Sequence, residues 1–434
     1  MPTVKSTDSR QPREVDGVPL IKWMIRRLTA DFSGRVTLLA VCPNSESVTR
    51  AALEVARDAN TPMLFAATLN QVDREGSYTG WTPETFMAFL RDESARIGLK
   101  TPALACLDHG GPWLKDHHTT AGYTFEQTMA EVKRSLEACI DAGYALLHID
   151  PTVDRTLPKD APMPIDLVVE RTLDMIAHAE AYRKARQMPR ISYEVGTEEV
   201  HGGLADMSVF DSFLSSLDAG LAKLHLQDAW PSFVVGKVGT DLDTTFFDPD
   251  VAAQLTAHVK PYGALIKGHY SDYVDNPHQY PLSEMGGANV GPEFTEEEFL
   301  ALEDLVRLER LLGKRSGFET ALKDAVVASG RWKKWLKPDE IGRGFDSLPE
   351  ERRRWLLRTC SRYIWADPAV RNARADLYHN VRDHRNADRY VIWWIKQAIM
   401  KYVHAFNLFD FNDRLGVPQE AGLGTAREEE IIVR

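Results

Sequence analysis

The chain has 434 residues, of which 44% are hydrophobic and 26% are charged, as in an ordinary globular protein. Its net charge of −11 argues against a nucleic-acid-binding protein, because binding to phosphates needs a basic face. No apolar run approaches the ~20 residues that span a bilayer. The four cysteines show no CxxC spacing. We therefore expect a cytoplasmic protein with reduced thiols. The polar composition of residues 1–17 predicts a flexible segment.

Short apolar, β-branched runs alternate with helical patterns over residues 36–312. The runs predict buried strands over 36–42, 63–68, 102–107, 145–150, 190–196, 231–239, 263–269 and 286–291. The intervening patterns predict helices, with Thr82, Thr124 and Thr295 at helix starts. Eight strand–helix units in about 280 residues indicate a (β/α)8 TIM barrel, an α/β fold, which we assign to residues 18–312. No GxGxxG motif follows the first strand, so a dinucleotide-binding sheet is the weaker alternative.

After Gly313 the strand-like runs stop and helical patterns continue. We predict a helical C-terminal region over residues 313–415 and a loose tail over 416–434. The arginines and aromatic residues of this region are interpreted as packing on the barrel or on a partner subunit, rather than as a phosphate site.

Acids and imidazoles recur where the predicted strands end. They are Asp108, His109, His148, Asp150, Glu194, His269 and Asp272. In a TIM barrel this edge carries the active site. Two imidazoles and a carboxylate suit a divalent metal such as zinc or manganese, and further carboxylates would move protons beside a polarised carbonyl. For single residues the alternatives are a buried core histidine at position 148 and a simple turn at Asp150.

Seven segments together resemble one family, the Z-type subunit of tagatose-bisphosphate aldolase. This subunit is described as accessory or non-catalytic, and it is also labelled a tagatose 6-phosphate kinase. The segments, in the family's order and spacing, are NQVDREGSYTGWTP (70–83), DHGGPW (108–113), HIDPT (148–152), YEVGTEEVHGG (193–203), GHYSDY (268–273), NVGPEFT (289–295) and RYIWADPAVRNA (362–373).

The resemblance implies a barrel distantly related to the class II, zinc-dependent aldolases. It implies that Asp108 carries a proton and that His109 binds the metal, together with Glu194 and His269. We expect Asp150 to move a proton as well. The residues expected to bind substrate are Ser45, Asn70, Gln71, His148, Glu198, Asp272 and Asn289.

One feature of the catalytic aldolases is missing. They carry a further zinc histidine in a Gly-x-x-His-Gly turn, whereas the corresponding residues 236–240 read GKVGT. An acid such as Glu198 or Asp241 would have to replace that ligand. The chain also lacks a GxxxxGK[ST] loop, so the residues do not support a kinase. The segment 286–289, GGAN, is a candidate for binding a sugar phosphate.

Two hypotheses follow from these residues. The first is an accessory subunit for ketose (tagatose) phosphate metabolism that stabilises or assists a catalytic class II aldolase partner. The second is a stand-alone divalent-metal aldolase or epimerase of a ketose, ketose phosphate or related sugar acid, as the metal-dependent ketohexose and tagaturonate epimerases are. In both, zinc is the expected metal, with manganese as the alternative, and the ligand is a ketose or sugar phosphate. Self-association of the chain is compatible with either.

Overall fold

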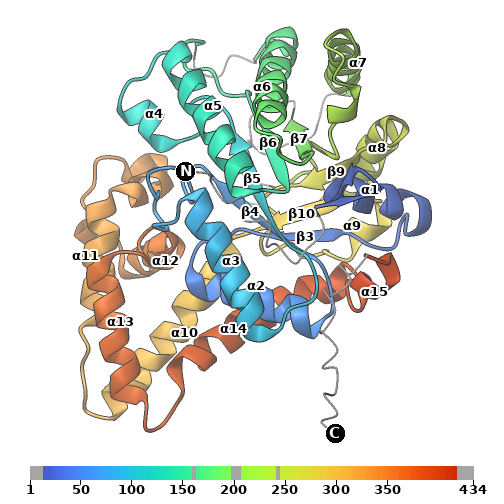
Figure 1. The fold of residues 1–434 in the computed structure, drawn as a ribbon. Helices are drawn as coiled ribbons and strands as arrows, with labels where there is room; N and C mark the ends of the chain where they lie inside the picture. The colour runs from blue at the N-terminus through green and yellow to red at the C-terminus, as the bar shows by residue number, and fades with distance from the viewer. Residues whose placement is uncertain (1–12, 159–162, 197–206, 241–244, 418–434) are drawn as a thin grey trace, which may run out of the picture.

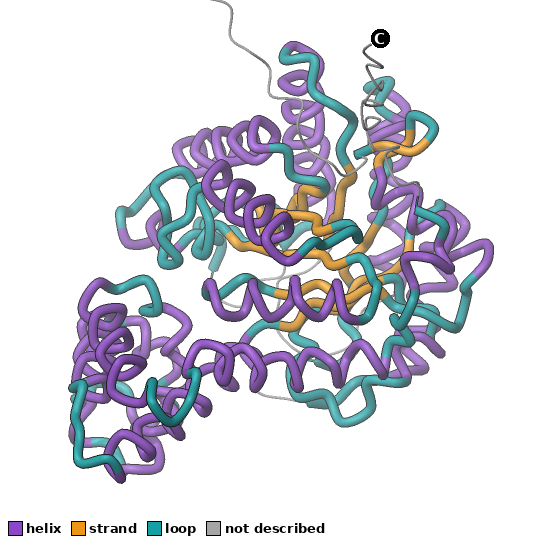
Figure 2. Tube along the Cα trace, turned by 60° about the horizontal axis from the view of Figure 1, so that its bottom comes forward, coloured by secondary structure: helices purple, strands orange, loops and turns teal. Residues whose placement is uncertain are grey.

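A computed structural model describes residues 13–158, 163–196, 207–240 and 245–417. Eight parallel strands close into a barrel in the order β10-β3-β4-β5-β6-β7-β8-β9. This confirms the predicted TIM barrel, whose strands lie at the centre of Figures 1 and 2 with helices around them. The strands are β3 (Leu38–Val41), β4 (Met63–Thr68), β5 (Ala103–Gly110), β6 (Leu146–Ile149), β7 (Ser192–Gly196), β8 (Phe233–Val235), β9 (Leu265–Gly268) and β10 (Gly287–Val290).

The outer helices follow the strands in sequence, as parallel pairing requires. They are α2 (Glu46–Asp58), α3 (Pro83–Ile97), α4 (Asp116–Thr120), α5 (Phe125–Ala142), α6 (Ile165–Ala185), α7 (Met207–Lys223), α8 (Pro249–Val259), α9 (Gln279–Leu282) and α10 (Pro292–Leu311). Thr82 and Thr124 cap α3 and α5 with reciprocal capping boxes, as predicted. The buried apolar side chains of strands and helices form one continuous core.

The predicted start of α10 at Thr295 is wrong. The helix begins at Pro292, whose ring fixes φ for a first helical turn. The Asp272 carboxylate accepts hydrogen bonds from the Gly291 and Glu293 backbone amides at 2.9 and 2.8 Å and takes the capping role. Thr295 lies inside the helix, where its hydroxyl accepts a hydrogen bond from the Trp365 indole.

The predicted flexible segment reaches too far toward the barrel. Residues 13–17 belong to a hairpin of β1 (Glu14–Val15) and β2 (Val18–Pro19), which leads into α1 (Leu20–Asp31). Glu14 accepts a hydrogen bond from the Arg190 backbone amide at 2.8 Å, and this contact ties the hairpin to the loop before β7. Residues 1–12 lie outside the described residues.

The C-terminal region is helical, as predicted. It contains α11 (Phe318–Ser329), α12 (Glu350–Cys360), α13 (Pro368–Val381), α14 (Ala387–Ala405) and α15 (Phe411–Leu415). In Figure 1, α11, α12 and α13 stand beside the barrel, and α14 returns to pack on α2 and α10. The buried Glu54 of α2 pairs there with Arg389 and Lys396 of α14. The predicted packing on the barrel is therefore confirmed for α14. Of the predicted tail, residues 418–434 lie outside the described residues.

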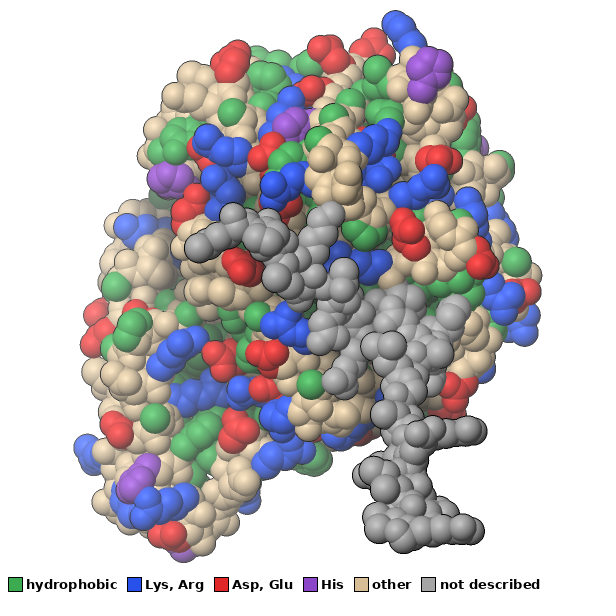
Figure 3. All heavy atoms as spheres, viewed as in Figure 1, with side chains coloured by type: hydrophobic (Ala, Val, Ile, Leu, Met, Phe, Trp, Pro, Cys, Tyr) green, Lys and Arg blue, Asp and Glu red, His purple; other side chains and the backbone are tan. Residues whose placement is uncertain are grey.

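The surface carries both signs of charge. Figure 3 shows Lys and Arg side chains interspersed with Asp and Glu over the visible face. Within the described ranges, no helix has the length and apolarity needed to cross a membrane. All four thiols are unpaired.

Candidate metal and substrate site

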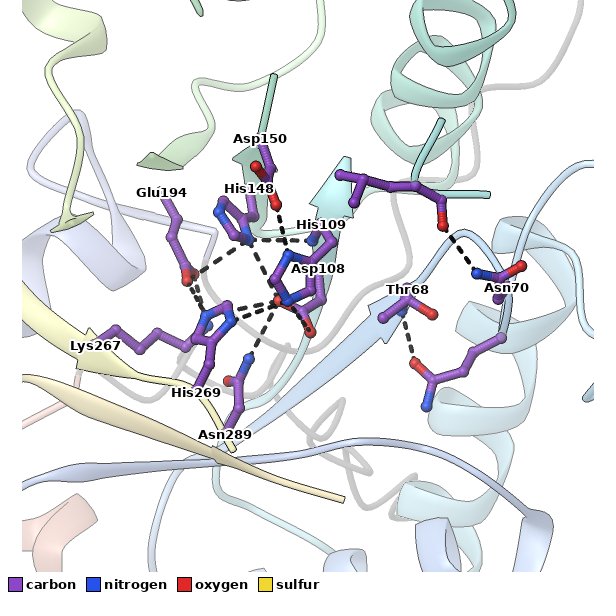
Figure 4. A network of polar contacts seen from close by, with 12 residues as sticks. Thr68, Asn70, Asp108, His109, His148, Asp150, Glu194, Lys267, His269 and Asn289 are labelled. Atoms are coloured by element: carbon purple, nitrogen blue, oxygen red, sulfur yellow. Dashed lines mark hydrogen bonds and ion pairs between the residues drawn. The ribbon is translucent and has the colours of Figure 1, made fainter. Parts of the chain in front are cut away.

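A β-bulge in β5 sets the position of the Asp108-His109 pair. The register of β5 against β6 shifts between Leu107 and Gly110, and His109 adopts a φ of 50°, which is uncommon for a residue with a side chain. Gly111 packs tightly against the residue that follows β6: a Cβ added to Gly111 would lie 1.6 Å from the Asp150 carbonyl oxygen. Bulges re-aim side chains next to functional sites. Here the bulge brings Asp108 and His109 into one polar cluster (Figure 4).

Four buried side chains from four strand ends converge in this cluster. We call Asp108, His148, Glu194 and His269 the metal group, because one ligand atom from each lies within 4.8 Å of the others. Asp108 Oδ1 is 3.3 Å from His148 Nδ1 and 3.8 Å from His269 Nε2. His148 Nδ1 also accepts a hydrogen bond from the His109 backbone amide at 3.1 Å, which a metal at this nitrogen would displace. Glu194 Oε1 is 2.8 Å from His269 Nε2 and 3.8 Å from His148 Nδ1. A tetrahedral zinc site has ligand–ligand distances of about 3.4 Å, so these four atoms match its size.

The predicted ligand set of His109, Glu194 and His269 does not surround one point. His269 lies between the other two, with Nδ1 3.0 Å from His109 Nε2 and Nε2 2.8 Å from Glu194 Oε1. The two nitrogens of an imidazole point in different directions, so an ion at either one meets only one of the two neighbours. His148 supplies the second imidazole of the metal group. The predicted replacements for the missing histidine, Glu198 and Asp241, lie outside the described residues.

A buried lysine neutralises one member of the metal group. Lys267 Nζ lies 2.6 Å from Glu194 Oε2, and both side chains are fully buried. Burial alone lowers the pKa of Lys267, but the Glu194 and Asp108 carboxylates outweigh burial and raise it. An ammonium group held in this way is a fixed charge and not a nucleophile. Gly287 on β10 makes room for the lysine stem, with 3.3 Å from an added Cβ to Lys267 Cγ.

Asp150 acts on His109 and does not reach the cavity. His109 Nδ1 donates to Asp150 Oδ2 at 2.6 Å, and the Thr152 hydroxyl donates to Asp150 Oδ1 at 2.5 Å. Burial alone lowers the pKa of His109, but Asp108 and Asp150 outweigh it and raise the pKa to about 9. The Asp150 carboxylate therefore orients and charges the His109 ring, whose Nε2 faces the metal group.

The cluster has groups that would fit a divalent cation. Three carboxylates, Asp108, Asp150 and Glu194, face two cations, Lys267 and His109, so one negative charge is uncompensated. One polar atom facing the cavity, Asn289 Oδ1, is buried and has no hydrogen-bond partner among the described residues. Buried polar atoms are rarely left in this state, and a ligand or ion often explains them. The buried His, Asp and Glu set is therefore suited to holding a metal.

A cavity of about 1290 Å³ opens above the metal group. On the barrel side its lining includes Asp108, His109, His269, Asp272 and Asn289. On the opposite side the lining comes from the C-terminal region and includes Arg331, Lys334, Trp335, Arg352, Arg362 and Tyr363. Ligand pockets for small molecules are commonly ~300–1,000 Å³, so the space is sufficient for a phosphorylated sugar with water.

Comparison with known proteins identifies the family. The model of the D-tagatose-1,6-bisphosphate aldolase subunit GatZ/KbaZ-like family matches residues 24–404. The chain belongs to the GatZ/KbaZ-like family. A solved structure from Sinorhizobium meliloti, described as a probable tagatose 6 phosphate kinase, is 21% identical, with a TM-score of 0.67 over 85% of this chain and all of that one. Campylobacter jejuni fructose-bisphosphate aldolase is 10% identical, with a TM-score of 0.51 over 90% of this chain and 93% of that one. At these identities the two structures support the barrel fold.

In this GatZ/KbaZ-like chain, three residues expected to bind substrate make structural hydrogen bonds, although Asn70 and Gln71 also line the cavity. The Ser45 hydroxyl caps α2 and donates to Glu298 at 2.5 Å, away from the cavity. The Asn70 amide holds the loop after β5, by donating to the Leu114 carbonyl and accepting from the Asp116 amide; it lies apart from the metal group in Figure 4. The Gln71 side-chain oxygen accepts a hydrogen bond from the Thr68 backbone amide, and its nitrogen donates to Asn44 Oδ1.

The other candidates divide in a similar way. Asp272 lines the cavity but caps α10. Asn289 lines the cavity and donates to Asp108 at 3.2 Å, which leaves its carbonyl oxygen free for a ligand. Glu198 lies outside the described residues. The expected phosphate loop at 286–289 is wrong: Gly286 is buried against β9, where an added Cβ would lie 2.5 Å from Leu265 Cβ.

Sequence reasoning missed Lys267, Asn44 and Arg362. Lys267 had a signal, because alternation along β9 places it on the same face as His269. Arg362 opens the seventh family segment but was interpreted as a packing residue. Asn44 carried no signal, since it follows a strand without any neighbouring acid or imidazole.

Proposed function

We propose that this GatZ/KbaZ-like chain is the accessory subunit of a class II D-tagatose-1,6-bisphosphate aldolase, and that it binds a ketose phosphate beside a divalent metal, zinc in the first instance. The observation that carries the proposal is the metal group: four ligand atoms of suitable type and spacing at the carboxyl ends of the barrel strands, in a chain of this family. This is the edge where TIM barrels carry out chemistry.

The residues around the metal group support the binding of a cation. In the metal-free arrangement, hydrogen bonds run from Asp150 through His109 and His269 to Glu194 and Lys267. A cation at His269 Nε2 requires that nitrogen to be unprotonated. The His269 proton then lies on Nδ1 and is donated to a neutral His109. A divalent cation there would thus displace one net proton, which His109 would lose, while the His269 proton would move from Nε2 to Nδ1. This would balance the single uncompensated negative charge of the cluster.

A divalent ion here would supply Lewis acidity toward a ketose carbonyl. The chain's own groups would position the sugar and move protons. The free Oδ1 of Asn289 would accept a hydrogen bond from a sugar hydroxyl. His109, oriented by Asp150 and exposed to the cavity, would exchange a proton with the substrate. We therefore assign proton transfer to His109, and we assign Asp150 the positioning of that ring.

A second candidate function is a stand-alone metal-dependent aldolase or epimerase. The feature that favours it is the complete set of four buried ligands despite the missing family histidine. An accessory subunit would need to bind the sugar phosphate without turning it over, whereas a stand-alone enzyme would act without a partner.

Two measurements on the purified full-length chain test these candidates. The first is metal content by mass spectrometry, for which we expect about one divalent ion per chain and a loss of that ion in His148→Ala. The second is cleavage of D-tagatose 1,6-bisphosphate by the chain alone and with a catalytic class II aldolase subunit. We expect no cleavage alone and a rise in the partner's activity or half-life.

The outcomes separate the two functions. Partner-free turnover of a ketose or ketose phosphate would reject the accessory role in favour of the stand-alone enzyme. A chain that binds no metal when zinc and manganese are supplied would contradict both. His118→Ala is the matched control, because His118 is also buried but lies outside the metal group, and its metal content should equal that of the wild type.

A further inference from the structure

The side of the cavity opposite the metal group carries more basic than acidic side chains, the acids of the lining on this side being Asp116, Glu340 and Glu351. We call Arg331, Lys334, Arg352 and Arg362 the roof cations; all four line the cavity and come from the C-terminal region. Three of them are paired with acids. Arg331 lies 3.1 Å from Asp116, Lys334 also pairs with Asp116, and Arg352 lies 3.0 Å from Glu340.

Arg362 differs from the other roof cations. Its residue is only 6% exposed, yet among the described residues its guanidinium forms no ion pair. Nη2 donates to the Tyr363 hydroxyl at 3.0 Å, while Nη1 is buried with no hydrogen-bond partner. The guanidinium lies 4.8 Å from the Trp335 ring centroid and 4.9 Å from that of Tyr363. A buried guanidinium without an anion is costly, because a buried charge needs a partner.

A second free donor, on Asn44, lines the same cavity as Arg362 and is linked to it through two tyrosines. Asn44 is 2% exposed and lines the same cavity. Its Oδ1 accepts from Gln71 Nε2 at 2.6 Å and from the Tyr78 hydroxyl at 2.9 Å, so Nδ2 is the free end, and it has no partner among the described residues. The Tyr78 and Tyr363 rings pack edge to face at 5.3 Å, which connects Asn44 to Arg362.

The usual anion site of a TIM barrel is already filled. Phosphate commonly binds at the end of the last strand and at a helix N-terminus there. In this chain, the corresponding N-terminus of α10 holds the Asp272 carboxylate, which accepts from the Gly291 and Glu293 amides. These amides are therefore not available to an external anion, so the free donors elsewhere in the cavity are the better partners.

We propose that Arg362 and Asn44 form a phosphoryl-binding site, in which the guanidinium Nη1 and the amide Nδ2 donate to the oxygens of a sugar-phosphate monoester. This deepens the proposed function and rests on it: the phosphoryl end of the ketose would lie under the C-terminal region, and the carbonyl end beside the metal group. Guanidinium groups form strong, directed hydrogen bonds to phosphate. Arg331, stacked 5.0 Å from the Tyr363 ring centroid, adds positive potential nearby.

The test is calorimetric titration of the full chain with three probes: inorganic phosphate, D-tagatose 6-phosphate and D-tagatose. We expect Arg362→Met to weaken the binding of inorganic phosphate and of D-tagatose 6-phosphate about 10- to 100-fold, because a charge-assisted hydrogen bond is lost. Binding of D-tagatose should be unchanged. Arg362→Lys should recover part of the lost affinity, because it keeps the charge but not the fork of donors.

A second variant keeps the test decisive if Arg362→Met folds poorly. Asn44→Asp is nearly isosteric, and its carboxylate still accepts from Gln71 and Tyr78. We expect this variant to weaken the binding of inorganic phosphate and of D-tagatose 6-phosphate at least about 10-fold, because a negative charge replaces a hydrogen-bond donor. Arg371→Met is the control: Arg371 is an exposed arginine on the next helix that pairs with Glu46 and is absent from the cavity lining, so affinity should not change.

Two outcomes would overturn the proposal. One is affinity for D-tagatose 6-phosphate within twofold of the wild type in both Arg362→Met and Asn44→Asp. The other is loss of inorganic phosphate binding alone, which would assign the site to the free anion and not to the sugar phosphate. All titrations are repeated with chelator. If the metal content is zero but phosphate still binds in the presence of chelator, the proposed metal function fails and this phosphoryl site stands.

Discussion

The two sides of the cavity are built differently. On the barrel side, Asp108, His109, His148, Glu194, Lys267 and His269 come from strand ends and contact one another directly. On the roof side, the cations come from the C-terminal region, and three of them pair with acids that also line the cavity, Asp116 and Glu340. Among the described residues, Arg362 on the roof side and Asn44, in the barrel loop after β3, each keep a buried donor without a hydrogen-bond partner.

This difference assigns different tasks to the two sides. A network on rigid parallel strands holds its groups in fixed geometry, which metal binding and proton transfer require. A basic surface on an added helical region selects a charged group of the ligand without altering that geometry. Under the proposed function, the barrel would hold the reactive end of the ligand, and the C-terminal region would bind its anionic end.

Removal of the buried lysine should have the largest effect. Lys267→Met leaves the Glu194 carboxylate buried without its ammonium partner, and we expect the free energy of unfolding to fall by about 3–5 kcal/mol in the presence of chelator. Urea denaturation measures this loss. Lys133→Met removes a more exposed pair with Asp174 and should cost less than about 1 kcal/mol. Equal losses in the two variants would contradict the network on the barrel side.

Metal affinity distinguishes the metal group from its neighbour His109. His269→Ala should weaken zinc binding more than about 100-fold, because it removes a direct ligand, whereas His109→Ala removes only a hydrogen-bond partner of that ligand and should weaken it about 10-fold. Competition with a chromogenic chelator measures both constants. His258→Ala, at an exposed histidine, is the control. A larger loss in His109→Ala than in His269→Ala would instead favour the alternative group of His109, His148 and His269.

Anchoring of the C-terminal region depends on Glu54. Burial alone raises the pKa of Glu54, but hydrogen bonds from Arg389 and Lys396 outweigh burial and lower it. The carboxylate therefore stabilises the fold above its unfolded pKa of about 4.3, and this contribution is lost as the pH falls through the lower folded pKa. Glu54→Gln should lose about 1–2 kcal/mol at pH 7, and its difference from wild type should shrink in acid. Thermal unfolding at several pH values measures this; a pH-independent difference would rule out the ion pairs as its cause.

The smallest expected effect concerns Ser45, which lines neither side of the cavity. Ser45→Ala removes the cap of α2 and should cost about 1 kcal/mol of stability. Its affinity for D-tagatose 6-phosphate should stay unchanged, because the hydroxyl donates to Glu298 and does not line the cavity. Calorimetric titration beside a denaturation curve checks both statements, and reduced affinity would return Ser45 to the substrate site.

Much of the fold followed from local pattern. Apolar runs marked all eight strands, since parallel strands buried on both faces need continuous apolar sequence. The start of α10 was misplaced because its cap, Asp272, comes from a different segment of the chain. The site was harder for the same reason. Their positions at predicted strand ends marked His148 and His269 as candidates, but the arrangement of His269 between His109 and Glu194 involves the bulge in β5, which the sequence pattern did not reveal. Arg362 reaches the cavity only because α14 returns the C-terminal region to the barrel.

Anomalous X-ray scattering from crystals of the zinc-supplied chain would test the central claim most directly. The account predicts one peak at the zinc edge, within bonding distance of His148 Nδ1 and His269 Nε2 and beside the carboxylates of Asp108 and Glu194. A peak bound through His109 and His269 Nδ1, or no peak in the barrel at full zinc supply, would contradict it.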